Sequence, residues 1–474
     1  MPINRRRFLT SSAACATLAS LPISFRSSWA SDGFLEIIAG PSQQKLYLDD
    51  APASDVWSYN GSTPGPEIRA KRGERVKVRL INKLDEPTSI HWHGIRIAND
   101  MDGVSGLTQE AVEPGGSFDY DFAVPDAGTY WYHAHNKSWN QVARGLYGAL
   151  IVDGDVPDID AEHDRTLILD DWRLDEQGQL DTASLGSLMD WSHGGRLGNW
   201  LTVNGKSLPN YSLNANEFYR LRLINTSNAR VLELDTKEFG SEILALDGQP
   251  LPAPAKLPDE PFLLGPAQRV DLLVKPKAGA PMELSEISRQ ERFTFASFDV
   301  VETPDSHPAT PVLIPNDLIE PTLKKARLVR LDMTGGAMGR MGDIVYNGRK
   351  LEASEFRTTK QMWAFNGVAN LAEAPFFSIR RGESVILETS NSTAFLHAMH
   401  IHGHHFRILE RGASEVGKGP IRDESRIWRD TFLIAPAQTT RIAFVADNVG
   451  KWLLHCHMLE HAAAGMNTWF EVTE

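Results

Sequence analysis

Four His-X-His pairs, placed toward the two ends of the chain, are the feature that most constrains the fold. The pairs are His91 with His93, His133 with His135, His400 with His402, and His455 with His457. If each pair lies on a β-strand, the alternation of side chains places both of its imidazoles on the same face. Eight imidazoles from opposite ends of a 474-residue chain meet only where two folded parts present these strands to each other.

The spacing around these pairs repeats, which indicates two copies of one domain. Gly73, in an Arg-Gly-Glu motif, stands 18 residues before His91. Gly382, in the same motif, stands 18 residues before His400. Repetition of this kind is the sequence signature of a repeated structural unit. A third copy begins near Asn216.

Short alternating segments separated by Gly, Pro, Asn and Asp fill the chain from Phe34 onward, for example residues 75–81, 220–224 and 441–445. Such segments are typical of β-sandwiches. One short helix is expected near residues 181–188. We therefore predict an all-β fold of three consecutive β-sandwich domains, at residues 31–155, 156–315 and 316–474. The middle domain is predicted to be a spacer, because Leu234 and Thr236 occupy its equivalents of the first histidine pair.

Charge and the N-terminal segment limit the partners and the location. The net charge of −13 argues against nucleic acid or an anionic membrane surface as a partner. Arg5 and Arg6 precede a weakly apolar run that Pro22 interrupts, and this run is too short for a membrane anchor. We predict that residues 1–30 are a twin-arginine signal peptide and that the chain is exported to a bacterial periplasm.

Removal of this segment would leave Cys456 as the only cysteine, which excludes an internal disulfide. Cys456 stands between His455 and His457, with His461 and Met466 downstream. Two histidines, one cysteine and a weak axial methionine form a blue-copper electron-transfer site. On a strand, the sulfur of Cys456 points to one face and both flanking imidazoles point to the other.

The second histidine of this blue site is predicted to be His397. It stands three residues before His400, so the two side chains are expected to lie on different faces, His397 toward Cys456. The eight paired imidazoles suit three further copper ions, with three nitrogens for each of two ions and two for the third. Zinc also binds imidazole, but it has no redox chemistry and no use for a second metal site connected to it through a thiolate.

With these motifs the chain resembles three-domain multicopper oxidases, the family of laccases, ascorbate oxidase and bacterial periplasmic cuprous oxidases. The resemblance covers essentially the whole mature chain and includes residues 59–66 and 265–271. It implies cupredoxin-like Greek-key sandwiches and four copper ions, namely one type 1, one type 2 and a type 3 pair. The implied ligands are His397, Cys456, His461 and Met466 for type 1; His91 and His400 for type 2; and His93, His133 and His457 on one type 3 ion, with His135, His402 and His455 on the other.

The resemblance also implies the activity. Substrate would be oxidised one electron at a time at the type 1 copper, and electrons would pass through Cys456 to a trinuclear cluster that reduces O₂ to water. Asp102 and Glu460 match acidic positions that the family uses for proton delivery, so the implied catalytic residues are Cys456, Asp102 and Glu460. We expect a monomer, because three domains in one chain complete the cluster.

The reducing substrate is left open between phenols or aromatic amines and cuprous ion. Met333, Met338 and Met341 are either soft ligands for cuprous ion or packing residues. The chain lacks the long methionine-rich insertion of many relatives that oxidise cuprous ion, which leaves cuprous-ion oxidation, and with it a role in copper homeostasis, neither indicated nor excluded.

Two non-enzymatic alternatives use the same fold. A copper-sequestration protein shares the ligands but has no need for a thiolate between two cluster histidines. A periplasmic cell-envelope protein of this fold has lost the copper ligands, whereas all twelve positions are filled here.

Overall fold

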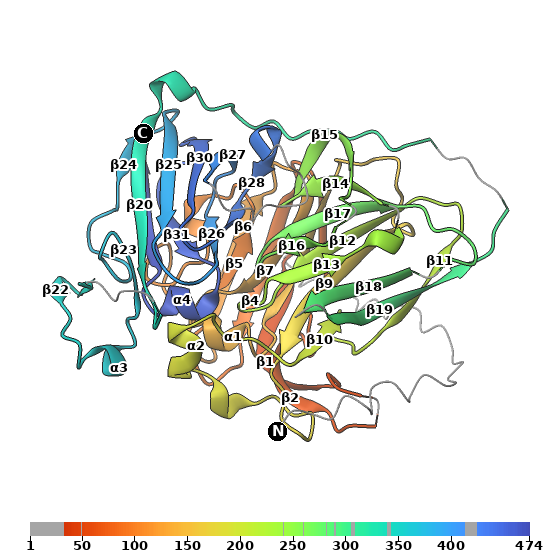
Figure 1. Cartoon of the computed structure of the whole chain (residues 1–474), viewed down its shortest axis with the longest axis horizontal. Coiled ribbons are helices and arrows are strands. Elements are labelled where there is room, and N and C mark those ends of the chain that lie inside the picture. Colours follow the sequence, from red (N-terminus) through yellow and green to blue (C-terminus); the bar gives the residue numbers. More distant parts are fainter. Residues whose placement is uncertain are drawn as a thin grey trace.

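A computed structural model describes residues 33–474, apart from 49, 240, 259, 281, 289–290, 305–308, 339–342 and 413–423. The predicted signal peptide, residues 1–30, lies outside the described residues, and so do His307 and Met341. Most strands of the described part group into three pairs of sheets, seen in orange, green and blue in Figure 1.

The first sandwich pairs a sheet of order β2-β1-β4-β6 with one of order β3-β8-β7-β5. Its strands are β1 (Leu35–Gln44), β2 (Ser54–Tyr59), β3 (Ile68–Lys71), β4 (Arg75–Asn82), β5 (Ile90–His93), β6 (Ser117–Ala123), β7 (Gly128–Ala134) and β8 (Tyr147–Asp153).

The middle sandwich pairs sheets of order β10-β9-β12-β17-β14-β15 and β11-β19-β18-β13-β16. Its strands are β9 (Asp164–Trp172), β10 (Trp200–Val203), β11 (Asn210–Asn214), β12 (Tyr219–Asn225), β13 (Leu232–Asp235), β14 (Glu242–Leu246), β15 (Gln249–Lys256), β16 (Phe262–Leu264), β17 (Arg269–Val274), β18 (Met282–Ser288) and β19 (Glu291–Val301).

The third sandwich pairs sheets of order β23-β20-β25-β30-β27-β28 and β24-β32-β31-β26-β29, with a small hairpin beside them. Its strands are β20 (Arg327–Gly335), β21 (Val345–Tyr346), β22 (Arg349–Lys350), β23 (Trp363–Phe365), β24 (Ser378–Arg380), β25 (Ser384–Asn391), β26 (His397–Ile401), β27 (Phe406–Arg411), β28 (Trp428–Arg429), β29 (Thr431–Ile434), β30 (Thr439–Val445), β31 (Gly450–Cys456) and β32 (Asn467–Thr473).

Helices are short and lie in the connections. They are α1 (Ser138–Gln141), α2 (Leu188–Ser192), α3 (Phe356–Thr359) and α4 (Leu459–Ala463), with 3-10 turns η2 (Asn99–Met101), η3 (Thr182–Ser184), η4 (Lys237–Phe239), η5 (Leu323–Lys325) and η6 (Glu424–Arg426). None of the helices within the described ranges has the length and apolar character needed to span a bilayer. The breaks between sandwiches fall between β8 and β9 and between β19 and β20, and the exact domain limits stay predictions.

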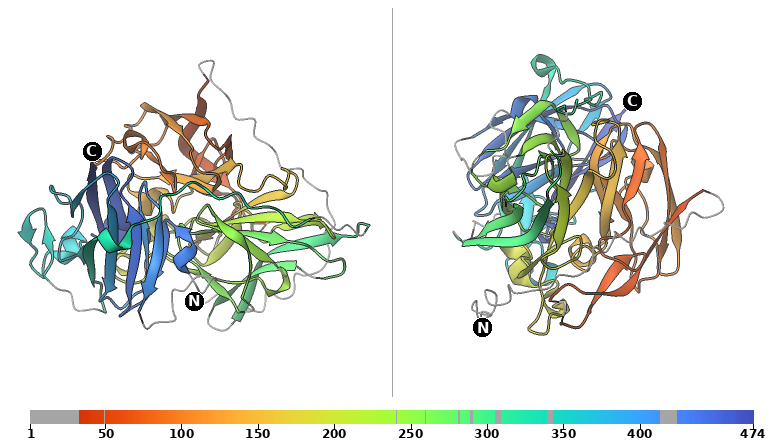
Figure 2. Two further views of the ribbon diagram at one scale, coloured as in Figure 1. Left: turned by 90° about the horizontal axis from the view of Figure 1, so that it is seen from above. Right: turned by 90° about the vertical axis from the view of Figure 1, so that its right-hand side faces the viewer.

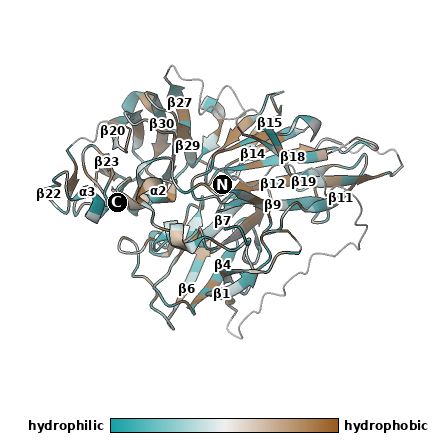
Figure 3. Ribbon diagram, turned by 60° about the horizontal axis from the view of Figure 1, so that its bottom comes forward, coloured by the Kyte–Doolittle hydropathy of each residue, from teal (hydrophilic) through white to brown (hydrophobic). Residues whose placement is uncertain are grey.

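Alternating side chains build each core. In β4, Val76, Val78 and Leu80 are buried while the residues between them are partly exposed. Burying these apolar side chains stabilises the sandwich by about 1.5 to 3 kcal/mol for each side chain. Hydrophobic and hydrophilic residues alternate along many outer strands (Figure 3).

The strands that carry the histidine pairs differ, because they are buried on both faces. Every residue of β5, β7 and β26 is buried, as are the last five of β31. In β7, Tyr130 and Tyr132 face the core of the first sandwich, while Trp131 belongs to a separate cluster between sandwiches. Seen from above, the three sandwiches meet around a common centre (Figure 2).

Candidate metal centre

Strand register brings the four histidine pairs together in two ladders. His91 on β5 lies opposite His133 on β7, and His400 on β26 lies opposite His455 on β31. The two ladders face each other across the boundary between the first and third sandwiches. The rings of His91 and His402 stack with centroids 3.9 Å apart. The predicted meeting of the eight histidines at a domain boundary is what the structure shows.

These histidines divide into compact sets of donor atoms, each set within 4.8 Å. Three of these sets draw on both outer sandwiches, and each holds three imidazoles. The sets are His93, His133 and His457; His135, His402 and His455; and His91, His93 and His400. We call these eight residues the trinuclear group.

Several ring nitrogens are held by backbone carbonyls, which fixes the ring orientation. The Nδ1–H of His91 donates to the carbonyl of Asp102 (2.8 Å), and that of His400 donates to the carbonyl of Asp430 (2.9 Å). The Nδ1–H of His133 donates to the carbonyl of Ala134 (3.1 Å). Metal-binding histidines are commonly oriented through their second nitrogen in this way.

The ring nitrogens that have no hydrogen-bond partner show whether these histidines fit a metal ion. The Nε2 atoms of His91, His133 and His400 are buried and have no hydrogen-bond partner, and neither has Nδ1 of His93. Both ring nitrogens of His457 are buried without a partner. Buried polar atoms are rarely left unpaired in folded proteins. Imidazole nitrogens suit copper, so the donor set fits copper ions.

Burial keeps these imidazoles neutral. It lowers the pKa of His455 to about 3 and lowers the pKa of His133 and His402 well below the usual range. Neighbouring imidazoles lower the pKa of His133 and His402 further, because two adjacent positive charges repel. A neutral imidazole is the form that binds a metal.

A second group lies on the other face of β31. The sulfur of Cys456 is 3.6 Å from Nδ1 of His397 and 3.9 Å from Nδ1 of His461, and the two nitrogens are 3.0 Å apart. Met466 is fully buried, and its carbonyl accepts the Cys456 N–H (2.9 Å). His397 and His400 on β26 do serve opposite faces, as the period of two requires. We call these four residues the cysteine group.

The outer nitrogens of the cysteine group are also held. Nε2 of His397 lies 2.7 Å from Oγ1 of Thr393. Nε2–H of His461 donates to the backbone carbonyl of His193, in the middle sandwich, at 2.6 Å. Burial raises the pKa of the Cys456 thiol to about 12. A bound metal ion would displace this proton, because the thiolate is the ligand.

The two predicted acidic residues have different surroundings. Asp102 is fully buried in the trinuclear group: its Oδ2 is 2.9 Å from Nδ1 of His402, and its Oδ1 is 3.3 Å from Nδ1 of His91. Glu460 on α4 is also buried, but it accepts hydrogen bonds from the side chain of Asn228 (2.7 Å) and the backbone N–H of Arg196 (3.0 Å). Its hydrogen bonds therefore reach the middle sandwich and not the trinuclear group.

Of the remaining histidines and methionines, some are buried and others lie at the surface. Nδ1–H of His404 donates to the carbonyl of His402 (3.1 Å), while His163 pairs with acidic residues at the surface. Met333 is buried, whereas Met338 is 70% exposed.

Sequence reasoning missed several residues that hold the ligands in place. Asp430 and Thr431 contact the trinuclear group, and Thr393 contacts the cysteine group. No spacing or motif singled them out. Arg269, which is ion-paired with Asp430, did lie within the segment 265–271 that carried the family resemblance.

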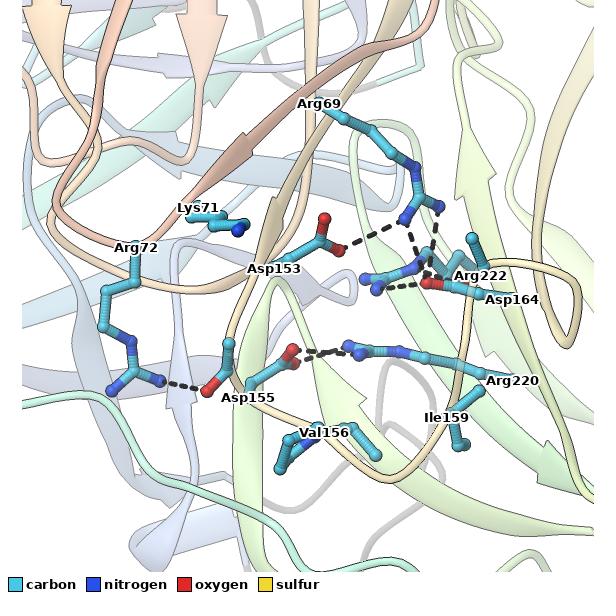
Figure 4. A pocket seen from close by; sticks show the side chains of 13 residues that line it. Arg69, Lys71, Arg72, Asp153, Asp155, Val156, Ile159, Asp164, Arg220 and Arg222 are labelled. Carbon is cyan, nitrogen blue, oxygen red and sulfur yellow. Dashed lines mark hydrogen bonds and ion pairs between the residues drawn. The ribbon is translucent and has the colours of Figure 1, made fainter.

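A cavity of about 410 Å³ lies elsewhere, between the first and middle sandwiches (Figure 4). Its charges are largely paired with one another: Arg220 with Asp155 (2.6 Å) and Arg222 with Asp164 (2.7 Å). It contains no residue of either group, so it is not the candidate site.

Comparison with known proteins agrees with this geometry. Residues 42–156 and 347–474 match family models that are both described as multicopper oxidase. The chain is 28% identical over 450 residues to the multicopper oxidase MmcO of Mycobacterium tuberculosis, covering 88% of this chain and 83% of that protein.

Solved structures share the whole architecture. The multi-copper oxidase from Pseudomonas thermotolerans superposes with a TM-score of 0.79 at 31% identity, over 92% of this chain and 98% of that one. A multicopper oxidase from Campylobacter jejuni, described as a metallo-oxidase, superposes with a TM-score of 0.76 at 26% identity, over 96% and 95%. The all-β, three-sandwich prediction is confirmed.

Proposed function

The chain belongs to the multicopper oxidase family, and we propose that it oxidises a small reducing substrate one electron at a time with O₂ as the final acceptor, reduced to water. The observation that carries this proposal is the position of β31 between the two groups. Cys456 lies in one group, and its sequence neighbours His455 and His457 lie in the other. A protein that only stores metal has no need for this covalent connection.

The residues that would hold copper follow from the donor sets. The cysteine group would hold type 1 copper through His397, Cys456, His461 and Met466, and the trinuclear group would hold type 2 copper and the type 3 pair in the assignment given by the resemblance. When bound, the four copper ions supply single-electron exchange with the reductant and four-electron reduction of O₂.

Asp102 is proposed to hold and deliver protons. Its Oδ1 is buried and lacks a hydrogen-bond partner, while its Oδ2 is fixed by His402. Oδ1 thus keeps an open acceptor position beside the trinuclear group, 3.3 Å from Nδ1 of His91. The same role for Glu460 stays a prediction that its contacts with Asn228 and Arg196 do not support.

Cuprous ion is the reductant that we favour over a phenol or an aromatic amine. Met189 on α2 and Met338 are 63% and 70% exposed, and thioethers are soft ligands that suit cuprous ion. The N–H of Ala337 donates to the carbonyl of Ser192 (2.8 Å), which joins the Met338 segment to the end of α2. The next residue, His193, covers His461 with its carbonyl.

Location and assembly are proposed from the chain itself. Arg5 and Arg6 support export by the twin-arginine route to the periplasm. A monomer is proposed, because one chain supplies every donor of both groups.

The test is to load the mature protein with copper and measure copper content, visible absorbance and oxygen uptake, with cuprous ion and 2,6-dimethoxyphenol supplied separately. Four coppers per chain, a blue band and oxygen uptake are expected, with the faster rate on cuprous ion. Copper binding beyond four ions without oxygen uptake would instead support sequestration, and absence of copper binding would contradict the oxidase proposal and favour an envelope role.

A further inference from the structure

Arg269, the first residue of β17 in the middle sandwich, forms a buried two-pronged ion pair with the third sandwich. Its Nη1 is 2.8 Å from Oδ1 of Asp430, and its Nη2 is 2.7 Å from Oδ2. Both side chains are 0% exposed. Moving two charges out of water costs free energy even when the charges are paired. A gain in the stability of the fold is therefore not a sufficient reason for this buried pair.

Asp430 lies against a histidine from each outer sandwich. Its Oδ1 is 3.3 Å from Nε2 of His93, and its backbone carbonyl accepts from Nδ1–H of His400. Thr431 donates its hydroxyl to the same Oδ1 (2.8 Å). The carboxylate is the acceptor for Nε2 of His93, which leaves Nδ1 as the nitrogen directed to the metal.

The guanidinium of Arg269 is itself fixed from several sides. Its Nε–H donates to the carbonyl of Thr129 in the first sandwich (3.1 Å), and Nη1 donates to the carbonyl of Ala267 (3.2 Å). Gly94, directly after His93, leaves room for it: a Cβ there would lie 2.4 Å from Nη2. All three sandwiches therefore meet at this one side chain.

We propose that Arg269 is a positioning residue for the trinuclear group, holding the Asp430 carboxylate in the plane that receives Nε2 of His93. The middle sandwich then takes part in the metal centre although it supplies no ligand, which revises the prediction that it is a spacer. The planar guanidinium can fix both carboxylate oxygens at once, and an ammonium group cannot. This inference rests on the proposed copper function.

The first variant is Arg269→Lys, which keeps the charge and loses the two-pronged geometry. We expect unchanged blue absorbance from the cysteine group, because no contact of Arg269 reaches it. We expect a weakened near-ultraviolet band of the type 3 pair, a shifted type 2 electron paramagnetic resonance signal, and copper retention at the trinuclear group reduced about tenfold or more.

A double variant separates positioning from stability. Arg269→Met with Asp430→Leu removes both charges, and such replacement of a buried pair is often neutral for folding. It removes the carboxylate from Nε2 of His93, which then keeps only the Thr431 hydroxyl at 3.4 Å as a neighbour, so we expect a near-native melting temperature with the type 3 and type 2 signals still altered. If both signals and four coppers are retained, the proposal is overturned.

The matched control is Arg222→Met with Asp164→Leu. Arg222 lies on β12 of the same sheet and forms a two-pronged pair that is nearly as buried, with bonds of 2.7 and 2.8 Å to Asp164. We expect its copper signals to be those of the unmodified protein, and equal changes in both doubles would also overturn the proposal. An unmodified protein that binds no copper would contradict the proposed function itself.

Discussion

Asp102 joins the two histidine ladders through a single carboxylate, since it contacts His402 of the third sandwich and His91 of the first. Replacing it with Asn keeps an oxygen for the His402 N–H and removes the site that accepts a proton. We expect Asp102→Asn to retain four coppers and to lower kcat about 10- to 100-fold, as measured by oxygen uptake.

Asp100 provides the control for this variant. It stands two residues earlier on η2 and is exposed. Asp100→Asn should leave kcat unchanged within error. An Asp102→Asn protein with the full rate over the whole pH range would show that protons arrive by another route.

Cys456 is the residue through which we propose that electrons enter. We expect Cys456→Ser to abolish the blue band and reduce steady-state oxidation to background, while the type 2 signal remains, because the trinuclear group keeps all eight histidines. Absorbance, resonance spectra and copper content check this result together. A blue Cys456→Ser protein would contradict the assignment of the cysteine group.

At the scale of elements, the turn after β5 brings three sandwiches into contact. Gly94 has φ +88°, and a Cβ there would approach Arg269 Nη2 at 2.4 Å and Asp430 Oδ2 at 2.6 Å. We expect Gly94→Ala to lower the free energy of unfolding by more than the roughly 1–3 kcal/mol of backbone strain alone. It should also disturb the type 3 signal.

Gly61→Ala is the comparison for that experiment. Gly61 has a similar φ of +80°, but nothing lies within 4 Å of a Cβ placed there. Chemical denaturation of both variants gives their free energies of unfolding, and the difference separates the effect of the steric contact from that of the backbone strain. Equal losses in the two proteins would mean that the space beside Arg269 is not needed.

The sequence allowed prediction of elements whose side chains carry a pattern. The alternation of apolar and polar residues in β4 predicted a strand with one buried face. The His-X-His spacing identified strands that are buried on both faces, where hydrophobic alternation alone is uninformative. The helix expected at residues 181–188 is instead η3 and the later α2, separated by Gly186 at φ +74°. A residue in the left-handed conformation ends the first helical turn, and the second helix begins only after it.

Other parts of the site had no sequence signal. Arg269 and Asp430 are residue types that usually lie at the surface, so nothing in their positions predicted complete burial. The acceptor for His461 is a backbone carbonyl of His193, and every residue has a carbonyl. Such contacts depend on how the sandwiches dock, which composition and spacing do not specify.

For the molecule as a whole, the buried histidines predict sensitivity to acid. Burial lowers the pKa of His455 to about 3 and of His461 to about 4, whereas an unfolded histidine titrates near about 6.5. Below about pH 6.5 the unfolded chain binds more protons than the folded chain. The neutral histidines therefore contribute stability above that pH, and this contribution is lost as the pH falls. We expect the melting temperature of the copper-free protein to fall steadily between about pH 7 and about pH 4.

His163 supplies a control of opposite sign. Partial burial lowers its pKa, but hydrogen bonds to Asp160 and Glu217 outweigh this effect and raise the pKa overall. Its contribution is therefore present at low pH and lost as the pH rises. His163→Gln should leave the acid-induced loss in place, and a melting temperature that is flat down to pH 4 in either protein would contradict the assigned cause.

The backbone carbonyl of His193, which covers His461, has a consequence for how the donor specificity of such an oxidase can change. His461 is completely buried beneath the His193 carbonyl, so a molecule arriving from solvent first meets the middle sandwich at that point, where Met189 is exposed. The ligands of both groups come from the outer sandwiches. The proposed donor-facing surface at His193 and Met189 is thus encoded apart from the residues of both groups, so this part of the surface can change while the metal donors are kept.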